Sequence, residues 1–353
     1  MPGTRITFLD GLAGQPQALE RVTAQVRRQL AGPAGDRLRA ARRPLLAGIG
    51  ASYAALALPV EVLRGHGVPA QRVLASEIEE GLGGFDTDLL IGVSQSGRSS
   101  ETIAAFRAAR DVPTLAVLNV TPSPLGALAA LTVDLGNEPD SCASTVGFTG
   151  TVIALDLIAG VLAGLAGRAG DSWDGVPEQA EAVRTRAAHA VAPLLARAAR
   201  CVAVDCVASG ASRVCAEEAA LLLREVPRMP AAASVTRNYL HGEMESAGNT
   251  LHLVFGRGRE IALARSLSAA GHLTLLVTTA RVEGAENLAV VRLPDTAPGA
   301  RVVLETVVAQ ELVAALGEER NVPMESIVFI NDDTKEGGVV VADFAHASPV
   351  AAL

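Results

Sequence analysis

The chain has 353 residues, 49% of them hydrophobic and 3% aromatic, which is enough for two domains with cores of alanine, valine and leucine. A formal charge of −8 argues against nucleic acid as a partner, because no excess of basic residues offsets the acids. No uninterrupted apolar run is long enough to cross a bilayer, and the first residues lack a signal-peptide pattern, so we expect a cytoplasmic protein without a membrane partner.

The cysteines and the single lysine limit the chemistry that the chain can perform. Cys142, Cys201, Cys206 and Cys215 form no CxxC pair and no cluster with histidine at zinc spacing. We expect them to be small reduced core residues, and we expect neither a metal nor a cofactor. Lys335 is the only lysine in the sequence, so a mechanism that needs a lysine amine has one candidate.

The first half reads as alternating strands and helices after an amphipathic helix predicted over 15–31. Short apolar runs predict strands at 44–49, 71–74, 88–93, 114–120 and 131–135, and helical patterns between and after them cover 52–64, 100–110, 123–130 and 147–167. Buried parallel strands separated by helices are typical of a doubly wound α/β sheet.

The second half repeats this order after a polar stretch, Gly167–Gly175, that predicts a domain break. A linking helix is expected over 177–198, followed by strands at 201–207, 250–255, 273–278 and 288–293 and helices at 211–226, 258–270 and 301–317. The predicted divisions are an N-terminal helical extension (1–35), a first domain (36–170), a linker helix (171–198) and a second domain with a C-terminal tail (199–353). The predicted fold is two tandem, flavodoxin-like, three-layer αβα domains.

A hydroxyl-rich loop, Ser94–Thr102, lies between the apolar run Leu89–Val93 and the helical pattern Ile103–Arg110. Such a junction presents backbone N–H groups, the positive end of a helix dipole and hydroxyl donors at one point. A phosphate with three acceptor oxygens suits that arrangement. The alternative is an ordinary helix capped by a serine, since serine favours caps.

Two further loops of the first half, Gly50–Tyr53 and Cys142–Thr145, carry hydroxyls just after predicted strands. Open α/β sheets bind ligands at the carboxyl ends of their strands. Arg98 is either an additional charge for the ligand or a residue facing solvent. The three loops together provide uncharged ligand-binding candidates that suit a phosphorylated sugar: Ser52, Ser94, Gln95, Ser96, Ser99 and Ser144.

These loops, with Ser94–Gly97, Gly50–Tyr53 and Ala143–Thr145 as their central residues, resemble those of the sugar isomerase (SIS) family. The similarity extends over about residues 40–320 and is greatest to the isomerase half of glucosamine-6-phosphate synthase and to its deglycase and deaminase relatives. The resemblance implies two SIS domains, a small-molecule sugar phosphate as the ligand, and a homodimer with a shared active site.

In the second half, Glu225 lies on a predicted helix face with Glu218 and Leu222, and His241 follows Glu225 by sixteen residues. In the resembling isomerases a helix glutamate and a histidine at this spacing shuttle a proton and open the sugar ring. The resemblance therefore implies that Glu225 moves a proton between C1 and C2 and that His241 opens the ring. From the residues alone, Glu225 is equally well a surface carboxylate and His241 a loop histidine.

The sequence departs from the resembling synthases at two lysine positions and in the tail. Leu222 and Val146 stand where those enzymes carry lysines. The tail lacks their Leu-Ala-Lys motif, and Lys335 is either the missing amine or a loop residue; Val339–Ala342 reads as a strand-like segment.

Two hypotheses follow. The first is a phosphosugar aldose–ketose isomerase working through an enediol, with amine removal, as in the related deaminases and deglycases, as an extension. The alternative is a non-catalytic sugar-phosphate sensor or regulatory protein.

Overall fold

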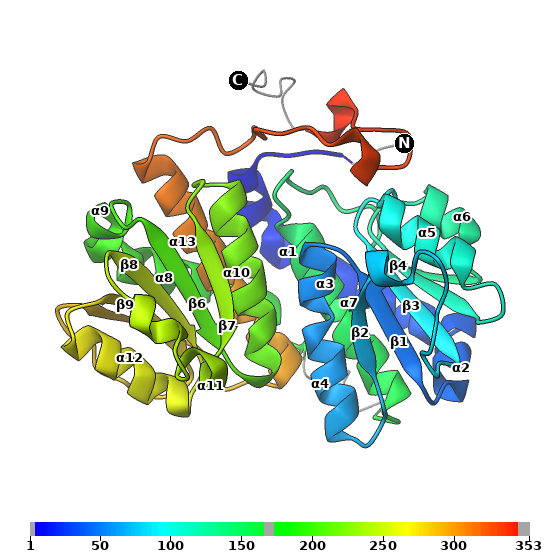
Figure 1. The fold of residues 1–353 in the computed structure, drawn as a ribbon, viewed down its shortest axis with the longest axis horizontal. Helices are drawn as coiled ribbons and strands as arrows, with labels where there is room; N and C mark the ends of the chain where they lie inside the picture. The colour runs from blue at the N-terminus through cyan, green and yellow to red at the C-terminus, as the bar shows by residue number, and fades with distance from the viewer. Residues whose placement is uncertain (1–3, 166–172, 345–353) are drawn as a thin grey trace. The chain divides into compact units, whose positions relative to one another are not determined.

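The computed structural model describes residues 4–165 and 173–344, and their contacts divide the chain into two compact units (Figure 1). The first unit comprises Met1–Asp174 and Glu325–Leu353, and the second comprises Gly175–Met324. Most of the predicted break at Gly167–Gly175, and the end of the predicted helix 147–167, lie outside the described residues.

The first unit is built on a five-stranded parallel sheet with the order β2-β1-β3-β4-β5. Its central strands are buried along their whole length, because helices cover both faces. The strands are β1 (Pro44–Gly48), β2 (Gln71–Leu74), β3 (Leu89–Ser94), β4 (Thr114–Leu118) and β5 (Leu131–Asp134).

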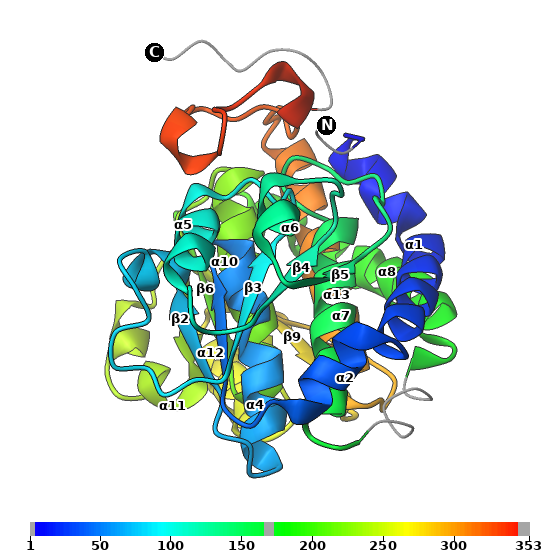
Figure 2. The ribbon, with the colours of Figure 1, turned by 90° about the vertical axis from the view of Figure 1, so that its right-hand side faces the viewer.

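The helices of the first unit form two layers around this sheet (Figure 2). One layer is α1 (Phe8–Leu30), α2 (Pro33–Ala40), α3 (Ala51–Ala55) and α4 (Ala57–Gly65), all of which pack against α7 (Val146–Leu162). The other layer contains α5 (Ser100–Ala108) and α6 (Pro124–Leu128), which pack against each other.

The second unit has a sheet with the order β7-β6-β8-β9-β10, also entirely parallel. Its strands are β6 (Ala203–Ala208), β7 (Ala231–Val235), β8 (Thr250–Phe255), β9 (Leu273–Thr278) and β10 (Leu288–Arg292). Its helices are α8 (Val176–Val191), α9 (Leu195–Ala198), α10 (Arg213–Glu225), α11 (Thr236–Tyr239), α12 (Arg259–Ala269) and α13 (Pro298–Glu319).

Numbered within its own unit, each sheet has the strand order 2-1-3-4-5, which is the flavodoxin-like order. The predicted fold class, two doubly wound α/β domains in tandem, is therefore confirmed. In this order the connections leave the first and third strands in opposite directions. The crevice for a ligand lies at that switch point, beside the carboxyl ends of those two strands.

Several element boundaries differ from the sequence prediction for local reasons. α1 begins at Phe8 instead of residue 15, because Thr7 caps it by accepting from the Asp10 N–H and its apolar face packs on α7 despite Pro16. The linking helix predicted over 177–198 is interrupted after Val191 by a short 3-10 turn that contains Pro193.

Strand β7 was missed because it is short, rich in alanine and partly exposed, so it lacks an apolar run. No helix among the residues that the structure describes has the length and apolarity needed to span a bilayer.

The C-terminal tail differs most from its predicted place. The sequence places it with the second domain, whereas its contacts group the residues from Glu325 onward with the first unit. Figures 1 and 2 both show the red end of this segment near α5, with which the 3-10 turn Asp332–Thr334 is in contact. The strand-like segment expected at Val339–Ala342 is instead the approach to a 3-10 turn, Val341–Asp343, because it finds no neighbouring strand with which to pair.

Gly92 in β3 offers a test of how the sheet fixes α5. A Cβ atom at this position would lie 2.2 Å from the Phe106 ring, so Gly92→Ala must displace α5 from the strand that leads into the hydroxyl-rich loop. We expect it to lower the free energy of unfolding by about 1–3 kcal/mol in urea titrations. The control is Gly14→Ala in α1, where a Cβ meets nothing within 4 Å; it should be stabilising by about 0.5–1 kcal/mol. Equal effects of the two changes would contradict this packing.

Candidate functional site

The hydroxyl-rich loop follows β3 at the switch point of the first sheet, where the topology places a ligand. Backbone groups of the following segment hold the loop in place. Asn119 and Val120 donate their N–H groups to the Gln95 carbonyl, and Leu125 donates to that of Gly97. The neighbouring strand β4 and helix α6 thus hold the loop open above the sheet edge.

The Ser99 side chain bears on the alternative that this loop is an ordinary serine cap. Ser99 is the N-cap residue of α5, yet its side chain accepts no capping hydrogen bond. Its hydroxyl instead shares a 3.0 Å hydrogen bond with that of Ser94. The Ser99 side chain therefore does not cap α5, whose N-terminal end carries a positive partial charge.

Gly97 has to be glycine at this turn. Its φ of +63° lies in the left-handed region, and a Cβ there would meet the Ser123 hydroxyl at 2.2 Å. The close approach of α6 to the loop is what excludes a side chain. Ser96, just before it, is buried, and its hydroxyl accepts from the Arg98 N–H at 3.3 Å, which leaves the hydroxyl hydrogen for a ligand.

Gln95 and Ser144 meet at a carboxylate that the sequence analysis did not single out. Asp140 is 1% exposed and accepts from the Ser144 hydroxyl at 2.6 Å, from the Thr145 N–H at 2.9 Å and from the Gln95 amide at 3.4 Å. Because the Ser144 hydroxyl donates its hydrogen to Asp140, it can only accept a hydrogen bond from a ligand. This corner of the site suits a ligand hydroxyl or amine, whereas the Ser94–Ser99 loop suits an anion.

Ser52 enters the site from the end of β1. Gly48 packs so closely against α3 that a Cβ on it would lie 3.0 Å from the Ser52 carbonyl carbon. The neighbouring Tyr53 is fixed by Arg72, whose guanidinium lies 4.3 Å from the ring centroid and donates to the Tyr53 carbonyl. The half-exposed Ser52 is thereby held at the same sheet edge as the hydroxyl-rich loop.

Arg98 does not face solvent, which was one of the two alternatives considered from the sequence. Its guanidinium is 13% exposed and pairs with the Asp343 carboxylate, itself 11% exposed, at 2.8 Å. It also donates to the carbonyls of Glu336 and Gly338. Arg98 therefore fastens the C-terminal tail to the loop instead of facing solvent.

The tail brings Lys335 beside the loop. Lys335 forms an antiparallel bridge with Ser99, and the next residue donates its N–H to the Arg98 carbonyl at 2.8 Å. Burial, together with Arg5 and Arg98, lowers the pKa of the Lys335 amine, and the Asp343 carboxylate opposes this shift. The one lysine of the chain is therefore an amine with an increased neutral fraction next to the predicted phosphate loop.

Glu225 and His241 belong to the second unit, and both are exposed within it. Glu225 is the last residue of α10, and His241 lies in the turn after α11, where its N–H donates to the Asn238 carbonyl. Leu222, which replaces a lysine of the resembling synthases, is fully buried in the same helix.

Asp140 and Asp343 were missed from the sequence, because both act through contacts with residues that no local pattern links to them. Asp140 follows no recognisable motif, and the pairing of Arg98 with Asp343 spans 245 residues. Cys142 was expected in the core but is half exposed, unlike the other three cysteines. Within the described ranges no three histidine, cysteine or acidic side chains gather as a metal site would require.

The pairing of Arg98 with Asp343 can be tested at Lys335, the single site for a lysine-specific protease. Breaking a buried ion pair is costly, so Asp343→Asn should release the tail and accelerate cleavage after Lys335 about tenfold or more. Fragment mass and the rate of loss of the intact chain provide the measurement. The exposed Asp333→Asn in the same tail is the matched control. Cleavage of the wild-type chain as fast as that of Asp343→Asn would show that the pair does not hold the tail.

Comparison with known proteins gives the same fold. Residues 37–160 match the model of the SIS domain family, while no curated protein sequence matches the chain. The C-terminal domain of glucosamine-fructose-6-phosphate aminotransferase from Francisella tularensis superposes with a TM-score of 0.77 at 17% identity, covering 89% of this chain and 96% of that one.

Two further solved structures share the architecture. Tagatose-6-phosphate ketose/aldose isomerase from Escherichia coli has a TM-score of 0.73 at 17% identity, covering 94% of this chain and 96% of that one. Glucosamine-6-phosphate deaminase from Thermotoga maritima has a TM-score of 0.63 at 17% identity, covering 86% and 94%. At these identities the likeness establishes the fold alone, a two-unit α/β architecture. Within it, residues 37–160 match the SIS domain model.

Proposed function

We propose that the protein is a phosphosugar aldose–ketose isomerase. The observation that carries the proposal is the N-terminal end of α5, which the Ser99 side chain does not cap because its hydroxyl bonds to that of Ser94. An anion bound there would accept hydrogen bonds from backbone N–H groups and hydroxyls. The positive end of the helix dipole would also stabilise its negative charge. The SIS family match over residues 37–160 supports this reading.

In this proposal the first unit binds the phosphoryl group and the sugar of the ligand at two different places. The phosphoryl group would lie at Ser94, Ser96 and Ser99, where the donors carry no competing carboxylate. The polar groups of the sugar would lie toward Gln95, Ser144 and the Asp140 carboxylate, and Ser52 would contact the ligand from the β1 side. A carboxylate at that corner would also favour an ammonium group, as an amino sugar phosphate carries.

Glu225 and His241 are the groups that we propose for the chemistry. Glu225 would take the proton from C2 of the open-chain aldose and return it to C1, by way of an enediol, and His241 would transfer the proton that opens the ring. The resemblance implies a homodimer with a shared active site, and we propose that these two residues act in it; both are exposed and therefore accessible to a partner subunit. The structures similar to this chain include a ketose/aldose isomerase and an amino-sugar-phosphate deaminase.

Lys335 extends the proposal to amine chemistry. An amine with a lowered pKa is a better nucleophile toward an open-chain carbonyl at neutral pH than an ordinary lysine. Its bridge to Ser99 puts it beside the proposed phosphoryl position. We propose that removal of a 2-amino group, if the enzyme performs it, involves this residue.

The phosphoryl site can be tested by affinity. A hexose 6-phosphate should raise the melting temperature, whereas the unphosphorylated hexose should not. Ser96→Ala removes one hydroxyl that would donate to the phosphoryl group and should weaken binding about 10- to 100-fold, because hydrogen bonds to charged groups are the strong ones. Ser76→Ala, an exposed serine outside the site, is the control. Unchanged affinity in Ser96→Ala would remove the loop from the proposal.

The catalytic assignment can be tested by proton exchange. In deuterated water the wild type should incorporate deuterium at C2 of an aldose 6-phosphate, detected by proton NMR. Glu225→Gln should keep the affinity for the sugar phosphate and slow the exchange by about 10²- to 10⁴-fold.

Glu319→Gln provides the control, since Glu319 is also an exposed glutamate in the last turn of a helix. A wild type that binds hexose phosphates but exchanges no proton in any of them would instead establish the sensor alternative.

A further inference from the structure

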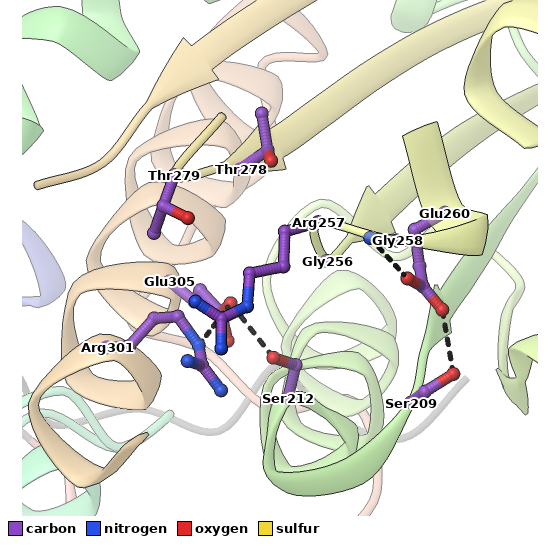
Figure 3. A pocket seen from close by; sticks show the side chains of 10 residues that line it. All are labelled: Ser209, Ser212, Gly256, Arg257, Gly258, Glu260, Thr278, Thr279, Arg301 and Glu305. Atoms are coloured by element: carbon purple, nitrogen blue, oxygen red, sulfur yellow. Dashed lines mark hydrogen bonds and ion pairs between the residues drawn. The ribbon is translucent and has the colours of Figure 1, made fainter. Parts of the chain in front are cut away.

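The second unit has a cavity at the switch point of its own sheet, at the place that corresponds to the hydroxyl-rich loop of the first (Figure 3). Its volume of about 140 Å³ is well above the roughly 10–15 Å³ that one water needs. The loops after β6, β8 and β9 and the start of α13 line it: Ser209, Ser212, Gly256, Arg257, Gly258, Glu260, Thr278, Thr279, Arg301 and Glu305.

Two arginines reach into this cavity from different elements. Arg257 comes from the loop after β8 and Arg301 from the first turn of α13, and Figure 3 shows their guanidinium groups converging near Glu305. Arg301 is largely buried, with its Nε 3.5 Å from a Glu305 oxygen. The pairing of Arg257, with Asp295 at 3.6 Å, joins two exposed side chains and contributes little.

Glu305 pairs with Arg301 through one oxygen only. The side chain is 1% exposed, and one oxygen accepts from the Ser212 hydroxyl at 2.9 Å. The other oxygen is buried and has no hydrogen-bond partner among the described residues. Burial raises the pKa of Glu305 to about 7, with the Glu260 carboxylate adding to the shift and Arg301 opposing it. A carboxyl group in this state can donate a hydrogen to a ligand oxygen or accept one from a ligand.

The second carboxylate of the cavity is already satisfied. Glu260 accepts from the hydroxyls of Ser209 and Thr236, each at 2.7 Å, and from the Gly258 N–H at 3.3 Å. It therefore occupies the N-terminal turn of α12 as an internal anion. Arg301 therefore has its counter-charge in Glu305, whereas the only ion pair of Arg257 among the described residues is with the exposed Asp295, and one carboxyl oxygen of Glu305 still needs a partner.

We propose that this cavity is a second ligand site, which binds a small anion of the phosphate type, either free inorganic phosphate or the phosphoryl group of a small metabolite. The anion lies between Arg257 and Arg301 and accepts from the hydroxyls of Thr278 or Thr279. The site differs from the hydroxyl-rich loop of the first unit in using fixed positive charge, so its affinity falls more steeply with ionic strength. It depends on none of the residues in the proposed catalytic function.

Equilibrium dialysis of the full-length chain with radiolabelled inorganic phosphate tests the proposal. Arg257 is exposed, so Arg257→Gln should leave the fold intact and weaken phosphate binding at this site about tenfold. Arg259→Gln removes the same charge two residues away, from an exposed position that does not line the cavity, and should leave this binding unchanged. Equal loss in both variants, or no loss in Arg257→Gln, overturns the proposal.

Ser96→Ala separates this inference from the proposed function. Phosphate binding that depends on Arg257 should persist in Ser96→Ala, whether or not the first-unit loop binds phosphate. If Ser96→Ala abolishes all phosphate binding, the second site does not exist. Competition between inorganic phosphate and glycerol 3-phosphate then identifies the source of the anion: the better competitor indicates whether the cavity takes the free ion or a phosphorylated metabolite.

Discussion

The functional account depends on one hydrogen bond, the 3.0 Å contact between the hydroxyls of Ser94 and Ser99. If Ser99 turned to cap α5, its oxygen would neutralise the first N–H groups of the helix and the loop would be a structural turn. Because Ser99 bonds to Ser94 instead, the helix presents its positive end to the crevice at the switch point of the sheet. The phosphoryl position proposed at this loop follows from this one choice of partner.

The tail is a second constraint on that same loop. The buried pair of Arg98 with Asp343 and the bridge between Ser99 and Lys335 tie a segment from the far end of the sequence to the loop after β3. The backbone of the loop is therefore held by the residues that follow β4, by α6 and by the tail. Such a double restraint pre-organises the donors, which reduces the ordering cost that a ligand would otherwise have to offset.

The sequence was sufficient for the architecture and for the loops, but not for the tertiary pairings. Apolar runs such as Leu89–Val93 reveal buried parallel strands because both faces of such strands are covered, whereas the short, half-exposed β7 gives no such signal. The hydroxyl-rich loop could be located because strand ends in open α/β sheets gather at one edge. Asp140, Asp343 and the Arg257–Arg301 cavity depend on side chains distant in sequence, and no local pattern encodes those contacts.

The most direct test of the account is a crystal structure of the full chain grown with fructose 6-phosphate. The account predicts phosphoryl oxygens within hydrogen-bond distance of the Ser96 hydroxyl and of the first backbone N–H groups of α5, with the Ser99 hydroxyl still turned toward Ser94. A bound sugar phosphate that leaves this loop empty, with Ser99 rotated to cap the helix, would contradict it.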